Sequence, residues 1–196
     1  TNAVLADSPI HYYRFEESSL LDPARDSVGL LPDGDHPGTY QGGVALGQPS
    51  AYALFGNALF LDGSLGTLVD LGTPFHPGPT VSVEAWVNLD SAASVSFHPI
   101  VARWDGSYDL DVSGGTGKAS FVTRNGSGEL AVAETSDSLT RGSWHHVVGV
   151  FSGGVTTVYL DGVRGTIVDT SATGTDLRDA GEALLIGAAQ GATPYT

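Results

Sequence analysis

The amino-acid sequence predicts an all-β protein, an antiparallel β-sandwich that forms one domain over residues 1–196. Its 27 Gly and 10 Pro are typical of many short strands that are joined by tight turns. After residue 95, runs rich in Val, Thr and aromatic residues recur at short intervals between turns of Gly, Asp, Asn and Ser. The chain shows no long amphipathic helical pattern and no internal linker that would divide it.

The elements of the first half of the chain are more widely spaced than those of the second half. Residues 9–15 (PIHYYRF) predict a first strand, since aromatic residues follow a proline that suits a strand edge. Residues 16–56 are rich in turn-forming residues and predict a long, largely irregular segment. Residues 57–72 predict a hairpin that turns at an Asp-Gly pair. The clearest strand is TVSVEAWVNL at 80–89, where apolar residues on one face alternate with Ser, Glu, Trp and Asn on the other.

Eight further strands are expected in the second half. They are the runs SFHPIVAR, SYDLDV, KASFVTR, ELAVAE, WHHVVGVF, TTVYLDG, GTIVDT and EALLIG. The stretch SWHHVVGVFSGGVTTVYLDG at 143–162 predicts a hairpin with a Ser-Gly-Gly turn. Its adjacent His145 and His146 point to opposite faces of a strand, so they cannot share a metal ion. GGTGKAS at 114–120 lacks the glycine and the hydroxyl that a phosphate loop requires, and it predicts a hairpin turn.

Charge and composition exclude several classes of function. Eight Lys and Arg against 22 Asp and Glu give a net charge of −14, which argues against nucleic acid as a partner. No apolar run approaches the roughly 18 residues that span a bilayer, so we expect no membrane insertion. The absence of Cys excludes disulfides, thiolate zinc sites and cysteine nucleophiles. The chain does not begin with Met and contains none, so we expect a processed, exported segment or an excerpt of a longer protein.

The carboxylates do not form the pattern of a glycoside hydrolase, which needs two of them facing each other across a cleft. Asp109 and Asp111 share a strand face, and we expect them to be a solvated or calcium-facing pair. Glu84 and Glu129 are alone on their strands, and the chain has no Gly-x-Ser-x-Gly nucleophile motif. The sequence therefore predicts a protein that is not an enzyme.

Calcium is the metal that the sequence favours, because oxygen ligands are plentiful in its expected loops. None of the Asp residues has the spacing of an EF-hand, and most of them individually suit turns. We expect one structural calcium ion that ties the segment 16–56 to the sandwich. The candidate ligands are Asp26, Asp62, Asp105 and Asp109.

The aromatic residues supply the candidate ligand-binding site. Trp104 lies in ARWDGSY, a turn expected at the rim of the sandwich, where it would either stack on a sugar ring or pack in the core. Core packing is the interpretation for Trp86 and Trp144. Asn125 begins an Asn-Gly-Ser glycosylation pattern that is also a favoured hairpin turn, and the turn is the preferred interpretation. The candidate ligand-binding residues are Trp104, Asp105, Tyr108 and Asn125.

Five phrases of the sequence resemble the bacterial, pentraxin-related version of the laminin-G-like domains, members of the concanavalin A-like lectin/glucanase superfamily. They are PIHYYRFEE, FLDG, TVSVEAWVNL, GSWHHVVGVFSGGVTTVYLDG and ALLIGAA, and they extend over about residues 5–189. The resemblance implies a jelly roll of two antiparallel sheets, often with a calcium ion at the rim. It also implies a carbohydrate-binding or adhesion module of an extracellular protein.

One departure from this family concerns the last strand. Family members continue after the LLIGA strand with a strand of the type G-x-I-D-E-V, and this sequence ends at AAQGATPYT instead. We expect an open sheet edge near residues 9–15, and the strand either lies outside this sequence or comes from a neighbouring subunit.

The sequence thus predicts a secreted, extracellular or cell-surface module that binds a glycan or another cell-surface ligand without catalysis, with support from calcium. The alternative is a structural subunit of an extracellular filament or surface layer, whose copies exchange strands through the open edge. An enzyme of the glucanase or lyase kind is disfavoured by the absent acidic cluster.

Overall fold

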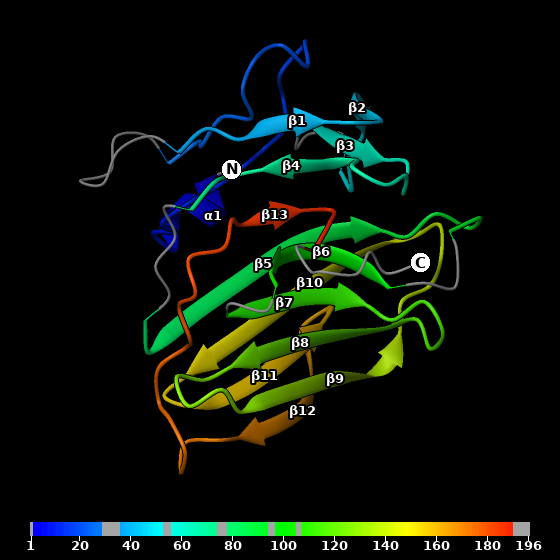
Figure 1. Ribbon diagram of the computed structural model, residues 1–196. Helices are drawn as coiled ribbons and strands as arrows, with labels where there is room; N and C mark the ends of the chain where they lie inside the picture. The colour runs from blue at the N-terminus through cyan, green and yellow to red at the C-terminus, as the bar shows by residue number, and fades with distance from the viewer. Residues whose placement is uncertain are drawn as a thin grey trace.

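The computed structural model describes residues 2–28, 36–52, 56–73, 78–93, 97–104 and 107–189. Two antiparallel sheets make up most of it (Figure 1). The larger sheet has seven strands in the order β1-β4-β13-β6-β7-β8-β9, and the smaller has four in the order β12-β11-β10-β5. β2 and β3 form a separate pair, and the short helix α1 precedes them all. The predicted antiparallel sandwich is confirmed.

The elements have the following bounds. The first half of the chain contains α1 (Asn2–Ala6), β1 (Thr39–Gln41), β2 (Val44–Pro49), β3 (Asn57–Leu61), β4 (Leu68–Asp70) and β5 (Thr80–Asn88). The second half contains β6 (His98–Arg103), β7 (Tyr108–Val112), β8 (Lys118–Arg124), β9 (Leu130–Ser138), β10 (Trp144–Ser152), β11 (Val155–Leu160), β12 (Val163–Asp169) and β13 (Leu185–Ile186). All eight strands predicted for the second half are present. In the described part of the chain, no helix is long and apolar enough to cross a membrane.

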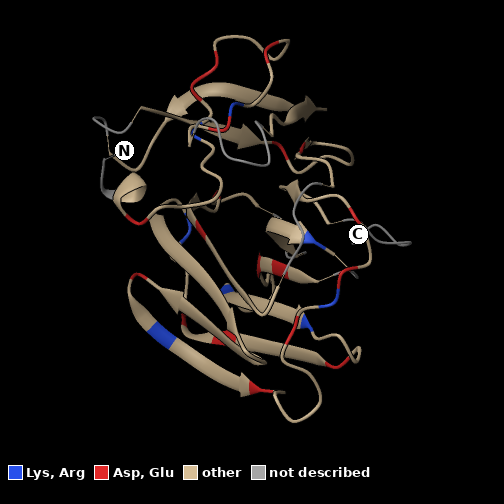
Figure 2. Ribbon diagram, turned by 90° about the vertical axis from the view of Figure 1, so that its left-hand side faces the viewer, with Lys and Arg blue, Asp and Glu red and all other residues tan. Residues whose placement is uncertain are grey.

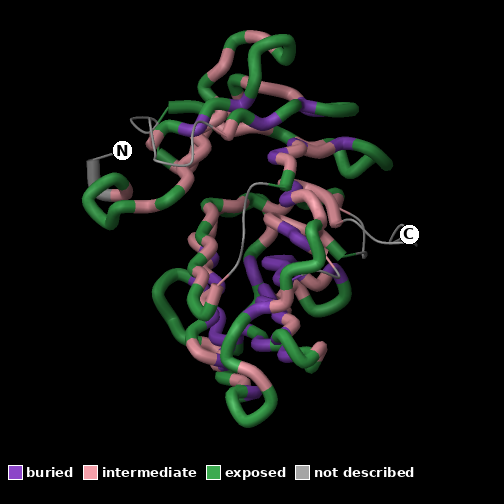
Figure 3. The backbone as a smooth tube through the Cα atoms, turned by 60° about the vertical axis from the view of Figure 1, so that its left-hand side comes forward, coloured by how far each residue is buried: buried purple, intermediate pink, exposed green. Residues whose placement is uncertain are grey.

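The hydrophobic core lies between the two sheets, where buried residues gather (Figure 3). β8 and β9 of the larger sheet contact β10, β11 and β12 of the smaller one. Phe121 on β8 and Phe151 on β10 are completely buried there, as are Val147 and Val158. Gly149 lets Phe121 approach β10, since a Cβ atom at residue 149 would lie 2.4 Å from the Phe121 ring. The two sheets therefore enclose one core of aromatic and aliphatic side chains, and the outer face of each sheet points away from this core.

The hairpin of β10 and β11 confirms the prediction for the stretch 143–162. Gly153 and Gly154 connect the strands, and both have positive φ angles of 56° and 90°. Asp161 and Gly162, with φ angles of 50° and 80°, form the next turn, to β12. Two consecutive residues with positive φ match the twist of an antiparallel pair, which explains why Gly-Gly and Asp-Gly occupy these turns.

The strand β5 shows the predicted alternation, with its even-numbered residues exposed and its odd-numbered residues turned to the core. Trp86 is therefore on the outer face, where it is 45% exposed. Its ring stacks on His146 of β10, with the ring centres 5.2 Å apart, and meets the Tyr52 ring edge-on. The interpretation of Trp86 as a core residue is wrong, because strand alternation turns it away from the valines. Trp144 is partly buried.

Residues 9–15 do not form the predicted strand. Among the described residues, Tyr13 makes an isolated bridge with Asp26 and the remainder of 9–15 has no strand assignment. The Asp26 carboxylate accepts the backbone N–H groups of Tyr12 and Val28, which draws this segment into a local side-chain network. The prediction of an open sheet edge at residues 9–15 is therefore wrong. The smaller sheet instead ends at β5 in the described part of the chain.

The predicted hairpin at 57–72 is also wrong. β3 pairs with β2, whereas β4 pairs with β1 and β13, so the two strands belong to different sheets. The Asp62 carboxylate accepts hydrogen bonds from the Ser64 N–H and the Thr67 hydroxyl, and Thr67 in turn accepts the Gly43 N–H. This loop takes the chain from the β2–β3 pair to the larger sheet. The Asp-Gly sequence alone predicts a hairpin turn instead.

Candidate ligand-binding site

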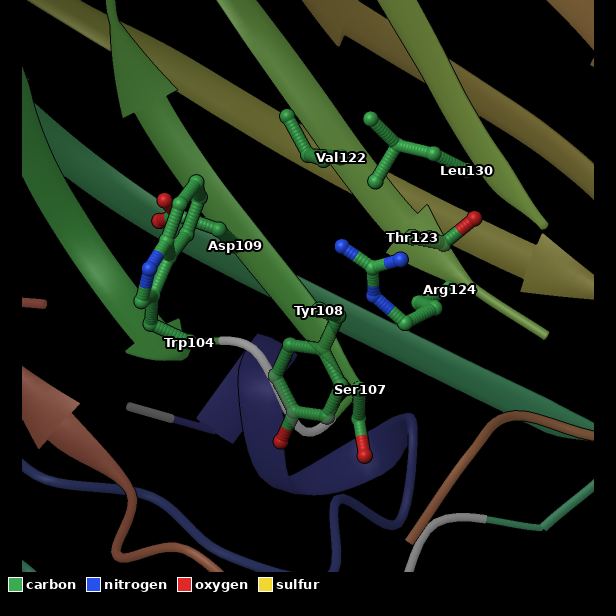
Figure 4. Close-up of a pocket in the computed structure, with 8 residues that line it drawn as sticks. All are labelled: Trp104, Ser107, Tyr108, Asp109, Val122, Thr123, Arg124 and Leu130. Carbon is green, nitrogen blue, oxygen red and sulfur yellow. The ribbon is translucent and has the colours of Figure 1, made fainter. Parts of the chain in front are cut away.

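A small hollow opens where β6 ends and β7, β8 and β9 lie side by side (Figure 4). Its volume is about 20 Å³, enough for one water-sized group. Tyr108 and Leu110 of β7 belong to the core, so the alternate residue Asp109 points to the outer face of the larger sheet. The residues that line the hollow are Trp104, Ser107, Tyr108, Asp109, Val122, Thr123, Arg124 and Leu130.

Both carboxylates of β7 are buried, although they face outwards from the sandwich core. Asp109 is 4% exposed and Asp111 is 1% exposed. Ser120 donates a hydrogen bond to Oδ1 of Asp111 at 2.5 Å, but Oδ1 of Asp109 has no hydrogen-bond partner in the described part of the chain. The expectation of a solvated pair is wrong, and Asp109 is an acceptor in the hollow that the described chain leaves unused.

Burial controls the protonation of this pair. Desolvation, with a further contribution from the nearby charge of Asp111, raises the pKa of Asp109 well above its ordinary value. Desolvation also raises the pKa of Asp111 to about 6, although the hydrogen bond from Ser120 acts in the opposite direction. Two carboxyl groups in one apolar environment favour the protonated form, so a group that donates hydrogen bonds or carries positive charge would suit Asp109.

The predicted residues Trp104 and Tyr108 both line the hollow. Trp104 follows β6 directly and is partly buried, so its ring forms one side of the opening (Figure 4). Tyr108 is buried, and its ring centre lies 6.2 Å from that of Phe121 in the core. Desolvation raises the pKa of Tyr108 to about 12, in spite of the nearby charge of Arg103, so its hydroxyl is neutral at physiological pH. Asp105 lies outside the described residues.

Asn125 lies apart from this hollow, in the turn after β8. It is 1% exposed, and its amide is used within the protein. Nδ2 donates to the Thr173 hydroxyl at 2.9 Å, while Oδ1 accepts the Glu129 N–H at 2.9 Å and the Ser127 hydroxyl at 2.7 Å. The Gly128 N–H donates to the Asn125 carbonyl at 2.8 Å, so the preferred interpretation of the Asn-Gly-Ser pattern as a turn is confirmed.

Asp26, Asp62 and Asp109, the predicted calcium ligands that the structure describes, are not grouped as ligands of one metal ion. The two Asp26 oxygens meet His11 and two backbone N–H groups, and the Asp62 carboxylate is engaged in its own loop. Hydrogen bonds from Ser64 and Thr67 lower the pKa of Asp62. No three His, Cys, Asp or Glu side chains within the described ranges are arranged to hold a metal ion. The calcium ion stays a prediction, with Asp105 outside these ranges.

Sequence reasoning missed five residues of the hollow, namely Ser107, Val122, Thr123, Arg124 and Leu130. Arg124 and Leu130 are paired across β8 and β9, and the Arg124 Nη1 donates to the Gly128 carbonyl at 3.0 Å. Leu130 is 50% exposed and supplies an apolar surface at the hollow. The signal was present in the period of two along residues 118–124, where Phe121 and its alternate neighbours form the core and Val122 and Arg124 face outwards.

The two antiparallel sheets and their shared core define the class of protein as a β-sandwich. The family model of the concanavalin A-like lectin/glucanases superfamily, a laminin G type, matches residues 62–196, and the chain belongs to this family. No curated protein matches the sequence.

Solved structures of low sequence identity share the fold. Domain 4 of AbnA, an extracellular arabinanase of Geobacillus stearothermophilus in complex with arabinotriose, is 18% identical with a TM-score of 0.62, over 95% of this chain and 85% of that one. The ligand-binding domain of botulinum neurotoxin serotype D in complex with N-acetylneuraminic acid is 16% identical with a TM-score of 0.65, over 94% of this chain and 44% of that one. The binding domain of Paraclostridial Mosquitocidal Protein 1 is 12% identical with a TM-score of 0.59, over 81% and 42%. The chain thus spans a little over two fifths of these two toxin chains.

Proposed function

We propose that this protein is a non-catalytic carbohydrate-binding module that acts outside the cell, as a secreted or cell-surface adhesion module. The observation that carries this proposal is the hollow, where an aromatic ring and an exposed leucine adjoin an unused carboxyl group. A sugar presents an apolar ring face and polar edges, and binding sites of this kind combine apolar walls with a few placed polar groups. Trp104 and Leu130 supply the apolar walls of the hollow, and Asp109 and Arg124 supply its polar groups.

The relatives of the fold support the proposal. An arabinanase domain holds arabinotriose and a toxin domain holds N-acetylneuraminic acid on the same sandwich architecture. Fold alone does not give function, so the argument rests on the hollow and the relatives add to it. The arabinanase is extracellular, in keeping with a role outside the cell.

The arrangement of carboxylates favours binding over hydrolysis. Glycoside hydrolysis requires an acid and a second carboxylate on opposite sides of the bond that breaks. Asp109 and Asp111 project from the same face of one strand, and both are buried. We expect no release of reducing sugars from a panel of plant, algal and bacterial polysaccharides, and sustained release would overturn the non-catalytic assignment.

The binding experiment is a glycan array probed with the wild-type protein in calcium and in a chelator. We expect at least one glycan class to bind, and Trp104→Ala to weaken its binding about tenfold or more, since loss of a stacked aromatic ring costs about 1–3 kcal/mol. Trp86→Ala is the matched control, because Trp86 is a half-exposed tryptophan on the opposite sheet. Loss of binding in the chelator alone would support the predicted calcium ion. Absence of binding in both conditions, or wild-type binding by Trp104→Ala, would count against the proposed site.

A second candidate function is assembly through strand exchange, and the edge of β5 favours it. β5 pairs with β10 over nine residues, and in the described part of the chain no strand pairs with its other side. Val81, Val83 and Val87 pack against the core but are only partly buried. A long edge of this kind accepts a further strand readily. Light scattering over a wide concentration range tests this candidate, and a monomer throughout would eliminate it.

A further inference from the structure

We infer that the hollow selects saccharides with a free amino group, whose ammonium binds between the carboxyl group of Asp109 and the ring of Trp104. This inference rests on the proposed function and names its ligand class. It starts from a feature of the hollow that the described chain does not explain, the buried Oδ1 of Asp109, which has no hydrogen-bond partner among the described residues. A buried polar group in that condition costs free energy unless a donor from elsewhere completes it.

The described protein does not supply that donor. Arg124 lines the same hollow, but its Nη1 is directed to the Gly128 carbonyl. Arg103, at the end of β6, donates to the Glu182 carbonyl and forms an ion pair with Asp179 at 2.8 Å. On the outer face of the sheet, Asp111 is the acidic neighbour of Asp109 on its own strand, and Glu134 on β9 lies in the row of Asp111.

The carboxyl groups on this face favour a cation beside Asp109, although the Arg124 guanidinium also lines the hollow. Two carboxyl groups of β7 lie on this face, and the nearby charge of Asp111 acts against the ionisation of Asp109. Acidic residues also predominate at the turns around the molecule, in keeping with the net charge of −14 (Figure 2). A positive group beside Asp109 would favour the ionised carboxylate and form a charge-assisted hydrogen bond with it.

The size and the wall of the hollow favour an ammonium group. A volume of about 20 Å³ admits one water-sized group, which an ammonium is and an acetamide is not. Trp104 lines the hollow together with Asp109 (Figure 4), and a tryptophan ring attracts a cation placed over its face. The rest of the sugar would stay outside, against Leu130 and Val132, which are both about half exposed. Amino sugars with an unsubstituted amine combine these properties.

The test compares two ligands that differ only at the amine. Isothermal titration calorimetry is carried out with a β-1,4-linked glucosamine trimer and with its fully N-acetylated counterpart. We expect the free amine to bind about tenfold more tightly or better, since a hydrogen bond between charged groups is stronger than one between neutral groups. Asp109→Asn keeps the shape of the side chain and removes its charge, and we expect it to abolish the preference.

Asp111→Asn is the matched control. It removes one charge from the same strand and face but not from the lining of the hollow, so it should retain the preference for the amine. Thermal unfolding of both variants establishes that they are folded before their binding is compared. Equal binding of the two trimers by the wild type, or a preference that survives Asp109→Asn, overturns the inference. If the array shows bound glycans but neither trimer binds, the inference fails and the proposed function stands. If no glycan binds at all, both fail.

Discussion

Nδ1 of His145 lies 2.7 Å from Oδ2 of Asp161. Asp161 is the first residue of the turn between β11 and β12. Nε2 of His145 accepts the backbone N–H of Thr140 at 3.0 Å, so the ring proton is on Nδ1 and is donated to Asp161. Both ring nitrogens are thus engaged within the protein. The adjacent His146 faces the other way and stacks on Trp86, as the strand period predicted. The His145 side chain therefore holds β10 to a neighbouring turn, whereas the His146 side chain packs against β5.

Asp161→Asn is expected to lower the free energy of unfolding at pH 7 by about 1 kcal/mol, because it weakens the hydrogen bond from His145. Burial acts to raise the pKa of Asp161, but the hydrogen bonds from His145 and the His146 N–H together lower it. A carboxyl group whose pKa is lower in the folded state stabilises above about pH 4, and this stabilisation is lost as the pH falls further. Urea unfolding at pH 7 and pH 3 measures the difference.

The matched control for this prediction is Asp137→Asn on β9, where an exposed side chain is replaced. We expect its effect to be close to zero at both pH values. If Asp161→Asn cost the same at pH 3 as at pH 7, the ionised carboxylate would not be the source of the stabilisation.

The buried Asp111 predicts the opposite dependence on pH. Its pKa is raised to about 6 in the folded protein, from an ordinary value of 3.8. The folded state therefore holds the proton more tightly, so the free energy of unfolding falls as the pH rises from about 4 to 6 and stays low above that. This difference in pKa corresponds to about 3 kcal/mol. Urea unfolding between pH 4 and pH 8 should show the decrease.

Asp111→Asn should flatten this pH dependence and make the variant more stable than the wild type at pH 8. We attribute any decrease in the free energy of unfolding that the variant still shows with rising pH to Asp109, whose pKa is also raised by burial. A wild-type stability that is constant from pH 4 to pH 8 would contradict the burial of both carboxyl groups.

Asn125→Ala is expected to lower the free energy of unfolding by about 2–3 kcal/mol, because it leaves the Glu129 N–H and other buried polar groups without a partner. We expect glycan affinity per folded molecule to be unchanged, since Asn125 does not line the hollow. Chemical denaturation and calorimetry measure the two quantities. A variant of normal stability that no longer bound glycan would return Asn125 to the ligand-binding site.

The part of the fold that the sequence predicts well depends on interactions between near neighbours in the chain. Gly153 with Gly154 and Asp161 with Gly162 set turns by their own backbone preferences, and the alternation along β5 sets its two faces. The strand predicted for residues 9–15 is wrong because the local pattern does not reveal the Asp26 side chain, which binds backbone N–H groups that strand pairing would otherwise use.

The residues of the candidate site also differ in whether they are close in the chain or are brought together only by strand pairing. Trp104 and Tyr108, predicted as ligand-binding residues, and Asp109, predicted as a calcium ligand, lie close together in the chain and all line the hollow. Arg124 and Leu130 join them only through the pairing of β7 with β8 and β8 with β9, whose register the sequence does not reveal. The burial of Asp109 depends on what covers the sheet, which strand alternation alone does not report.

Gly149→Ala tests the close contact between the two sheets. A methyl group there would lie 2.4 Å from the Phe121 ring, which is completely buried and cannot move without disturbing the core. We expect a loss of about 1–3 kcal/mol in the free energy of unfolding, and Phe121→Leu in the same chain should recover part of it. Gly115→Ala is the control, because no atom lies within 4 Å of a methyl group at that turn. Equal stability of the two alanine variants in urea unfolding would show that β8 and β10 are farther apart than this packing requires.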